Sequence, residues 1–185
     1  MEVQTCWYNG TFSSNFDGFL RGFKGFVKVG EYLDQNIEEI KPIITLVLSY
    51  LEDPNPKIRY ASCHCIGQIA NDMKPIFQTN FHEMILPSLI NCLRDPIPRV
   101  HGHAAAAITN FVEGMSSVIL KPYLTNLLTN FYEMIQKGIS IVKENAISAL
   151  AATAESAQDE FRFYYRDFIG LLFKILETHN SNEYR

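Results

Sequence analysis

Hydrophobic and polar positions repeat along this chain with one constant period. An Asp-Pro-Asn-Pro turn at residues 53–56 returns as Asp-Pro-Ile-Pro at residues 95–98. Apolar side chains keep the same interval in six further columns. Two of these columns are Ile66, Ile108 and Leu150, and Phe77, Ile119 and Phe161. Many columns with one period indicate a repeated supersecondary unit, which is typical of a solenoid.

Each unit predicts a pair of helices. The apolar run from Ile40 to Leu51 is expected to end at the first turn, because proline fixes φ and removes an amide donor. From Lys57 to Asn71, apolar residues recur at steps of three and four, the spacing of one helical face. The same pattern predicts helices at 79–93, 99–113, 123–136, 140–155 and 164–177. We therefore predict an all-α fold, an α-α superhelix of about four helical pairs.

The period also sets the expected boundaries of the units. We expect repeats at residues 35–77, 78–119 and 120–160, and an incomplete one at 161–185. Residues 1–34 are rich in glycine, which disfavours helix by about 1 kcal/mol per residue. They are expected to form an incomplete N-terminal repeat with a second helix near 18–34. Neither end has the polar face of a capping repeat, so we expect a piece of a longer array.

Composition and charge narrow the class of protein. Hydrophobic residues make up 47% of the chain and charged residues 19%, which excludes a disordered chain. The net charge is −4 and the sequence has no basic stripe, so nucleic acid is not an expected partner. No apolar run is long enough to cross a bilayer, and no signal peptide is recognisable, so we expect no membrane insertion and free cysteines in a reducing compartment.

The histidines and cysteines do not predict a metal site. Cys63, His64 and Cys65 are neighbours in one predicted helix, where residues i and i+2 point about 200° apart. Three such side chains cannot converge on one tetrahedral ion, and the same holds for His101 and His103. No nucleophile is paired with a base and no phosphate loop occurs. We expect structural thiols, surface histidines, no cofactor and no catalytic residue.

A polar stripe on the predicted second helices is the candidate binding surface. Tyr60, His64, Gln68 and Asp72 follow one another at steps of four, and Asn110 lies one full period after Gln68. Acidic residues recur near the ends of these helices at nearly the same period: Glu31, Asp72, Glu113 and Glu155. Helix C-termini disfavour carboxylates, so their recurrence suggests a function. The alternative is that they only decorate solvated helix ends.

Several segments resemble a known family. Residues 51–70 carry the Asp-Pro turn, the apolar-Arg pair and the alanine-containing helix of a HEAT repeat. The segments PKIRYASCHCIGQIAND, RVHGHAAAAITNFVE and KPYLTNLLTN resemble the middle of importin-β (karyopherin-β) superfamily nuclear transport receptors, and in particular the karyopherin-beta-three type. The resemblance runs in unbroken order over residues 31–185, and the sequence departs from the pattern before residue 31.

The resemblance implies a transport protein without enzymatic activity, present in cytoplasm and nucleus. First helices are expected on the convex side and second helices on the concave, cargo-facing side. The implied partners are protein cargo with basic localisation segments and, through the full-length receptor, nucleoporins and RanGTP. Similar receptors hold lysine-rich segments with acidic and asparagine residues at matching positions. The expected cargo-binding residues are Glu31, Tyr60, His64, Gln68, Asp72, Asn110, Glu113 and Glu155.

Arg59 resembles the arginine that links the turns of successive HEAT repeats. Its expected partners are the turn carboxylates of Asp53 and Asp95, while His101 and Lys143 occupy the same column in the later units. This feature predicts stability rather than a binding site.

Two other interpretations remain open. The chain fits a HEAT scaffold subunit of a phosphatase or chromosome-associated complex, whose concave face holds folded partners. It also fits, far less well, a HEAT-type lyase.

Overall fold

The computed structural model describes residues 37–183, and side chains from residue 40 to 177. This part of the chain is helical and contains no strand, which confirms the predicted fold class. The elements are α3 (Ile37–Ser49), the 3-10 turn η1 (Tyr50–Glu52), α4 (Pro56–Asp72), α5 (Ile76–Cys92), α6 (Pro98–Val112), α7 (Ser117–Lys137), α8 (Ser140–Ala157), the 3-10 segment η2 (Gln158–Phe163) and α9 (Tyr165–Glu183). The predicted helix at 18–34 and Glu31 lie outside the described residues.

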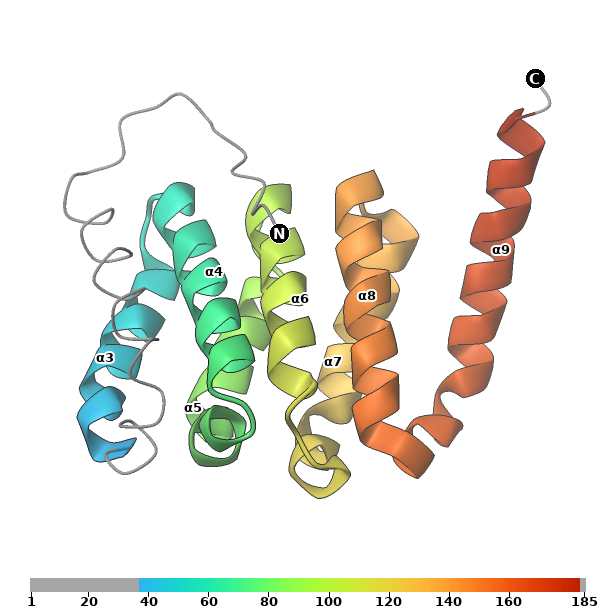
Figure 1. Ribbon diagram of the computed structural model, residues 1–185. Coiled ribbons are helices and arrows are strands. Elements are labelled where there is room, and N and C mark those ends of the chain that lie inside the picture. Colours follow the sequence, from blue (N-terminus) through green and yellow to red (C-terminus); the bar gives the residue numbers. More distant parts are fainter. Residues whose placement is uncertain (1–36, 184–185) are drawn as a thin grey trace, which may run out of the picture.

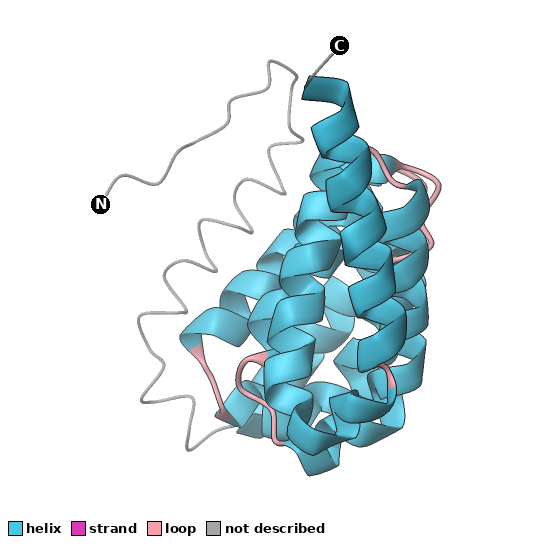
Figure 2. Ribbon diagram, turned by 90° about the vertical axis from the view of Figure 1, so that its right-hand side faces the viewer, coloured by secondary structure: helices cyan, strands magenta, loops and turns pink. Residues whose placement is uncertain are grey.

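The helices form two layers (Figure 1). The second helices α4, α6 and α8 stand side by side, and α4 packs on α6 as α6 packs on α8. The first helices α5 and α7 lie behind them, and α9 stands at the C-terminal edge. Figure 2, seen from the α9 side, shows the helices running roughly parallel with their loops at the two ends. The described residues thus hold three helical pairs and the first helix of a fourth.

The proline turns start the second helices as the sequence predicts. The Asn55 side chain caps α4 by accepting a hydrogen bond from the Lys57 amide at 3.0 Å, and Pro56 occupies the first turn. Within the turn, an Asp53 carboxylate oxygen accepts a hydrogen bond of 2.7 Å from the Asn55 backbone amide. Asp95 has the same position in the next turn and accepts a hydrogen bond of 2.9 Å from the Ile97 backbone amide. Proline supplies the fixed φ and the aspartate satisfies the turn amide, so this motif ends one helix and begins another.

Two of the first helices, α5 and α7, begin earlier than predicted. α7 begins at Ser117 rather than Tyr123, with the Ser116 hydroxyl accepting a hydrogen bond from the Ile119 amide, and Pro122 lies inside the helix. α5 begins at Ile76 rather than Thr79 and contains Pro87. The prediction was wrong for α7 because we placed the helix start directly after proline. Burial of the apolar face offsets the hydrogen bond that an internal proline removes.

The core runs between the two layers and the second helices approach each other closely. Ile66 and Ile108 from one column are completely buried, as are Phe77 and Phe111, which meet edge to face. At Gly67 of α4, an added Cβ would lie 3.1 Å from the Cα of Ala107 in α6. Small residues in the second helices therefore set how closely neighbouring repeats stack, and hence the surface that these helices present.

Helix α9 buries only part of its apolar face. Phe168 and Leu171 are buried, whereas Phe173 and Leu176 are 60% and 59% exposed. Burying such side chains is worth about 1.5–3 kcal/mol each. We expect this protein to self-associate with rising concentration, and Phe173→Ser with Leu176→Ser to weaken the association, as measured by light scattering. The change Val118→Ser, at an isolated exposed apolar residue of α7, is the control and should have no effect. A wild-type protein that stays monomeric, with strongly protected amides across α9, would contradict the prediction.

Candidate functional site

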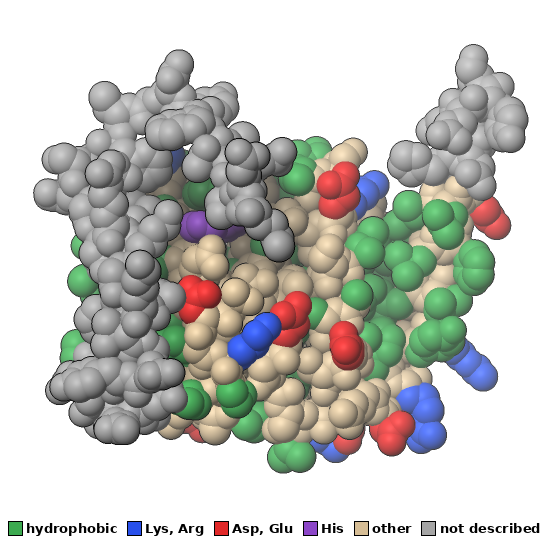
Figure 3. Space-filling view, in the orientation of Figure 1, with side chains coloured by type: hydrophobic (Ala, Val, Ile, Leu, Met, Phe, Trp, Pro, Cys, Tyr) green, Lys and Arg blue, Asp and Glu red, His purple; other side chains and the backbone are tan. Residues whose placement is uncertain are grey.

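The face formed by α4, α6 and α8 carries the predicted acidic residues. Asp72 is the last residue of α4, Glu113 follows α6 directly, and Glu155 lies in the last turn of α8. All three side chains are exposed. We call these three residues the carboxylate row. Figure 3 views this face and shows acidic side chains spaced across it, with basic side chains beside some of them.

Two members of the row share one hollow in the surface. Glu113 and Glu155 line a cavity of about 530 Å³ between the ends of neighbouring second helices, together with Lys74 and Gln158. Met115 and three serines, namely Ser116, Ser117 and Ser156, complete its wall. The polar lining and the two carboxylates suit a cationic group better than an apolar one.

Lys74 breaks the row that we expected to be purely acidic. Its Nζ lies 3.1 Å from Oε2 of Glu113, and both side chains are about two-fifths exposed. An ion pair this exposed contributes only about 0.2–1 kcal/mol, so another cation can replace Lys74. The sequence analysis missed this residue because it lies in the α4–α5 turn, nearly a whole repeat before its partner.

The N-terminal half of the stripe packs against α6. The Tyr60 ring lies on the His103 ring with centroids 4.3 Å apart, and the Arg99 guanidinium stands 4.9 Å from the Tyr60 centroid. His64 Nδ1 and His103 Nε2 are 3.0 Å apart, at hydrogen-bonding distance. His64 and Gln68 are exposed, but His103 is partly buried, which corrects the expectation of a surface histidine. Burial first, and then the charges of His64 and Arg99, lower the pKa of His103 to about 4, so it is neutral at pH 7.

Asn110 connects two helices. Its Nδ2 donates a hydrogen bond of 3.1 Å to the Gly67 carbonyl of α4. This contact gives Asn110 a structural role that the sequence analysis did not foresee, because one of its amide donors is used between repeats. Asn145 of α8 lies next to Gly102 of α6 in a similar way, since its amide nitrogen is 3.4 Å from the position of a Cβ at Gly102. The separation along the chain is the same in both Gly–Asn pairs, a sequence signal that adds Asn145 to the candidates.

The predicted link at Arg59 is confirmed for one of its two partners. Arg59 donates two hydrogen bonds to the Asp95 carboxylate, of 2.6 and 3.0 Å. Arg59 also donates a hydrogen bond of 2.8 Å to the backbone carbonyl of Asp53, and not to the Asp53 carboxylate. His101, in the same column, contacts the Asp95 carbonyl at 2.8 Å. The arginine therefore ties the turn of one repeat to that of the next.

The described residues offer little for other kinds of chemistry. Across residues 37–183, no group of three or more His, Cys, Asp or Glu side chains is placed to hold a metal ion. In the same part of the chain, no helix is both long and apolar enough to cross a membrane.

Comparisons with known proteins agree with this architecture. The family model for the HEAT repeat matches residues 43–73. Importin subunit beta-3 of Saccharomyces cerevisiae is 39% identical over 150 residues, which cover 80% of this chain and 14% of the relative. Crystal structures of Kap121p bound to Pho4p and to Nup53p each match with a TM-score of 0.74 and 38% identity, over 80% of this chain and 15% of theirs. A crystal structure of a Kap121p mutant, in which two aspartates and one glutamate are replaced by lysine, matches with a TM-score of 0.75 and 36% identity, over 82% of this chain and 15% of that chain. The chain thus spans about one seventh of the length of these relatives.

Proposed function

This chain belongs to the importin-β family of HEAT-repeat proteins, and from this premise we propose that it binds basic cargo segments on the face formed by α4, α6 and α8. The observation that carries the proposal is the carboxylate row, with one exposed acid at the end of each second helix. The relatives support it in two ways. Kap121p has been crystallised with Pho4p, and the acids exchanged for lysine in the Kap121p mutant recur at nearly the same interval as the acids of this chain.

The proposal extends to the wider role of the protein. We assign it to nuclear import, as part of a receptor that moves between cytoplasm and nucleus and has no catalytic activity. Nucleoporins and RanGTP are partners of the full-length receptor in this proposal. The importin name of one relative and the Nup53p complex of another support these assignments.

The geometry of stacked helices defines the kind of segment that fits. Packed helices lie about 8–10 Å apart, so the acids of the row follow one another at about this interval. A polyproline II peptide rises about 3.1 Å per residue and turns once in three residues, so every third side chain returns to the same side after about 9 Å. We propose an extended segment with lysines three residues apart. Its lysines meet Asp72, Glu113 and Glu155. In the sequence, Glu31 precedes Asp72 by 41 residues, the step that also separates Asp72 from Glu113, so Glu31 is proposed as a further cargo-binding residue. Gln68 and Asn110, about one turn before Asp72 and Glu113, are proposed to contact the segment beside the acids, and Tyr60 and His64 to contact it further along α4.

A peptide titration tests this proposal. Fluorescence anisotropy compares a peptide with lysine at every third position, a peptide of equal composition with its lysines in one block, and a neutral glutamine version. We expect the first to bind most tightly and its affinity to fall steeply with added salt, because several weak ion pairs act together. Equal binding of the charged and neutral peptides contradicts the proposal and favours a scaffold that holds folded partners.

Lys74 is expected to weaken cargo binding, because it forms an ion pair with Glu113 in the free protein and a cargo lysine must displace it. The change Lys74→Met removes the internal ion pair and should raise the affinity for the lysine peptide by about 1.4- to 5-fold, the equivalent of 0.2–1 kcal/mol. Lys121→Met is the matched control. It changes the net charge equally but releases Glu160, which Lys121 contacts at 2.7 Å outside the carboxylate row. Equal gains for the two variants would show that only net charge matters.

A further inference from the structure

Two cysteines from different repeats meet at the junction between α4 and α5. Cys63 lies in the middle of α4 and is completely buried, while Cys92 is the last residue of α5 and is 7% exposed. The Cys63 thiol lies within hydrogen-bonding reach of the Cys92 sulfur. Both are free thiols. Cys65, two residues further along α4, is also buried and free, and burial alone accounts for its perturbed pKa.

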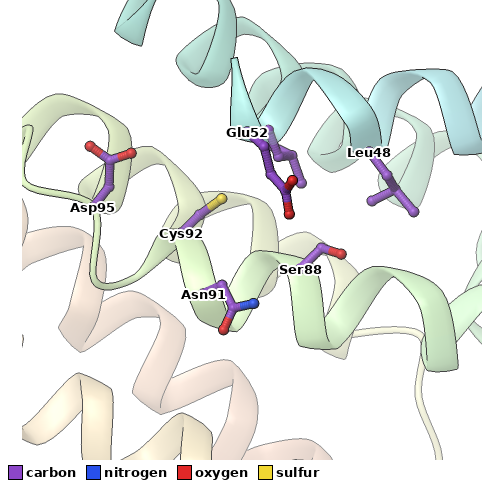
Figure 4. A pocket seen from close by; sticks show the side chains of 7 residues that line it. Leu48, Glu52, Ser88, Asn91, Cys92 and Asp95 are labelled. Carbon is purple, nitrogen blue, oxygen red and sulfur yellow. The ribbon is translucent and has the colours of Figure 1, made fainter. Parts of the chain in front are cut away.

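Cys92 is the member of the pair that solvent reaches. It lines a small pocket of about 120 Å³ between η1 and α5, together with Glu52, Ser88 and Asp95. Figure 4 shows these side chains around the pocket, with the Cys92 sulfur on the side facing Glu52. The volume corresponds to a few water molecules at about 30 Å³ each, so a small hydroperoxide fits beside the Cys92 sulfur.

We propose that Cys92 is an oxidation site for small hydroperoxides and that Cys63 resolves the oxidised sulfur into a disulfide joining α4 to α5. The geometric basis is a pocket that exposes one sulfur of a buried thiol pair. This proposal goes beyond cargo binding and is independent of it.

The reaction is balanced with the peroxide as the only other reactant. The Cys92 thiolate attacks the outer oxygen of the hydroperoxide, the O–O bond breaks, and the alcohol leaves with the proton, which gives a sulfenic acid. The Cys63 sulfur then attacks the Cys92 sulfur, the S–OH bond breaks, and the Cys63 proton leaves with hydroxide as water. Two thiols lose two electrons, and the peroxide becomes an alcohol and water.

The surroundings favour Cys92 as the attacking thiol. The Cys63 hydrogen bond lowers the pKa of Cys92 despite the opposing effects of burial and the Asp95 charge, and the Arg59 charge adds to the lowering. The hydrogen bond to Cys92 and burial raise the pKa of Cys63. Burial raises the pKa of Cys65 to about 12. The thiolate is the reactive form, so Cys92 should react first of the three.

A disulfide at this place would fix the junction between two repeats. Cys92 is three residues before Asp95, whose carboxylate binds Arg59 on α4. The covalent bond would therefore act at the same junction as the arginine link, where α4 of one repeat meets the turn of the next.

The experiment maps disulfides after exposure of the full chain to hydrogen peroxide. Every protein carries Cys6→Ser, so that the three described cysteines are the only thiols. Trypsin leaves all three in the peptide 60–94, because it does not cut before Pro75, and a Glu-specific protease then cuts after Glu83. We expect a 63–92 link in the wild-type background and in Cys65→Ser. In Cys63→Ser we expect no link, and a sulfenic acid on Cys92 that dimedone traps.

Rates and folding controls make the result decisive. Maleimide should alkylate Cys92 at least about tenfold faster than Cys65, since one unit of pKa changes the thiolate fraction tenfold. Circular dichroism melting confirms that each serine variant is folded. The map of the Cys6→Ser background needs no substitution at any of the three described cysteines. Alkylation of all three thiols at equal rates, a 65–92 link as abundant as the 63–92 link, or no link at all overturns the proposal.

Discussion

Replacing Asp72, Glu113 and Glu155 together by lysine is expected to weaken binding of the lysine-rich peptide strongly. Each lost ion pair removes about 0.2–1 kcal/mol, and each new lysine adds repulsion of similar size, so the affinity should fall by about tenfold to ten-thousandfold. All three side chains are exposed at or near helix ends, so the helix content and melting temperature should hardly change. Anisotropy titrations at two salt concentrations measure the loss, which should shrink as salt screens the charges.

The matched control reverses three acids on the first helices, at Glu83, Glu133 and Glu177. These residues are also exposed, and the control variant changes the formal net charge from −4 to +2 as the test variant does. It should keep most of the affinity, because its acids lie on α5, α7 and α9 and not at the ends of the second helices α4, α6 and α8. A similar loss in both triple variants would mean that the peptide responds to the total charge of the protein, and the carboxylate row would then be only a solvated face.

The change Arg59→Met is expected to destabilise the protein by about 3 kcal/mol. Arg59 and Asp95 leave only 14% and 7% of their side chains exposed, and removing one partner of such a pair leaves the other charge buried without compensation. Urea unfolding measures the difference. Arg94→Met is the control, because Arg94 hydrogen-bonds the neutral Asn130 amide oxygen at 2.9 Å and leaves no charge unpaired. In the double variant Arg59→Met with Asp95→Asn, part of the loss should return.

The cost of Arg59→Met should also depend on pH. Burial acts to raise the pKa of Asp95, but the Arg59 hydrogen bonds and charge more than offset it, and the net pKa lies below the ordinary value of 3.8. In the wild type, Asp95 therefore stabilises the fold above pH 3.8, and this contribution is lost as the pH falls through the lowered pKa. Without Arg59, burial is opposed only by the Ile97 amide hydrogen bond and the His101 charge, so the pKa of Asp95 rises. Protonation of Asp95 then removes the unpaired buried charge of the variant. The stability gap between wild type and variant should narrow from pH 7 towards pH 4, and a constant gap would contradict this account.

Much of the fold could be predicted from the sequence because it depends on local chemistry. The Asp-Pro turns at residues 53–56 and 95–98 end and start helices through proline geometry and through aspartate side chains that accept hydrogen bonds from turn amides, all within a few residues. The period then fixes which apolar columns face the core. The link between Arg59 and Asp95 follows from the same repeat, because each turn must meet the corresponding turn of its neighbour.

What the sequence alone determined about this protein was the repeat, its two layers of helices, its turns and the columns of acids. The tertiary structure alone decided which side chains of different repeats touch. The position of Lys74 beside Glu113, the hydrogen bond from Asn110 to Gly67, and the meeting of Cys63 with Cys92 could not be predicted from spacing. Such contacts depend on the distance and angle between packed helices, and these are set by the fit of many side chains at once, such as Ala107 against Gly67. Helix periodicity tells which face of a helix is buried, whereas the stacking of the helices determines the partner that each side chain meets.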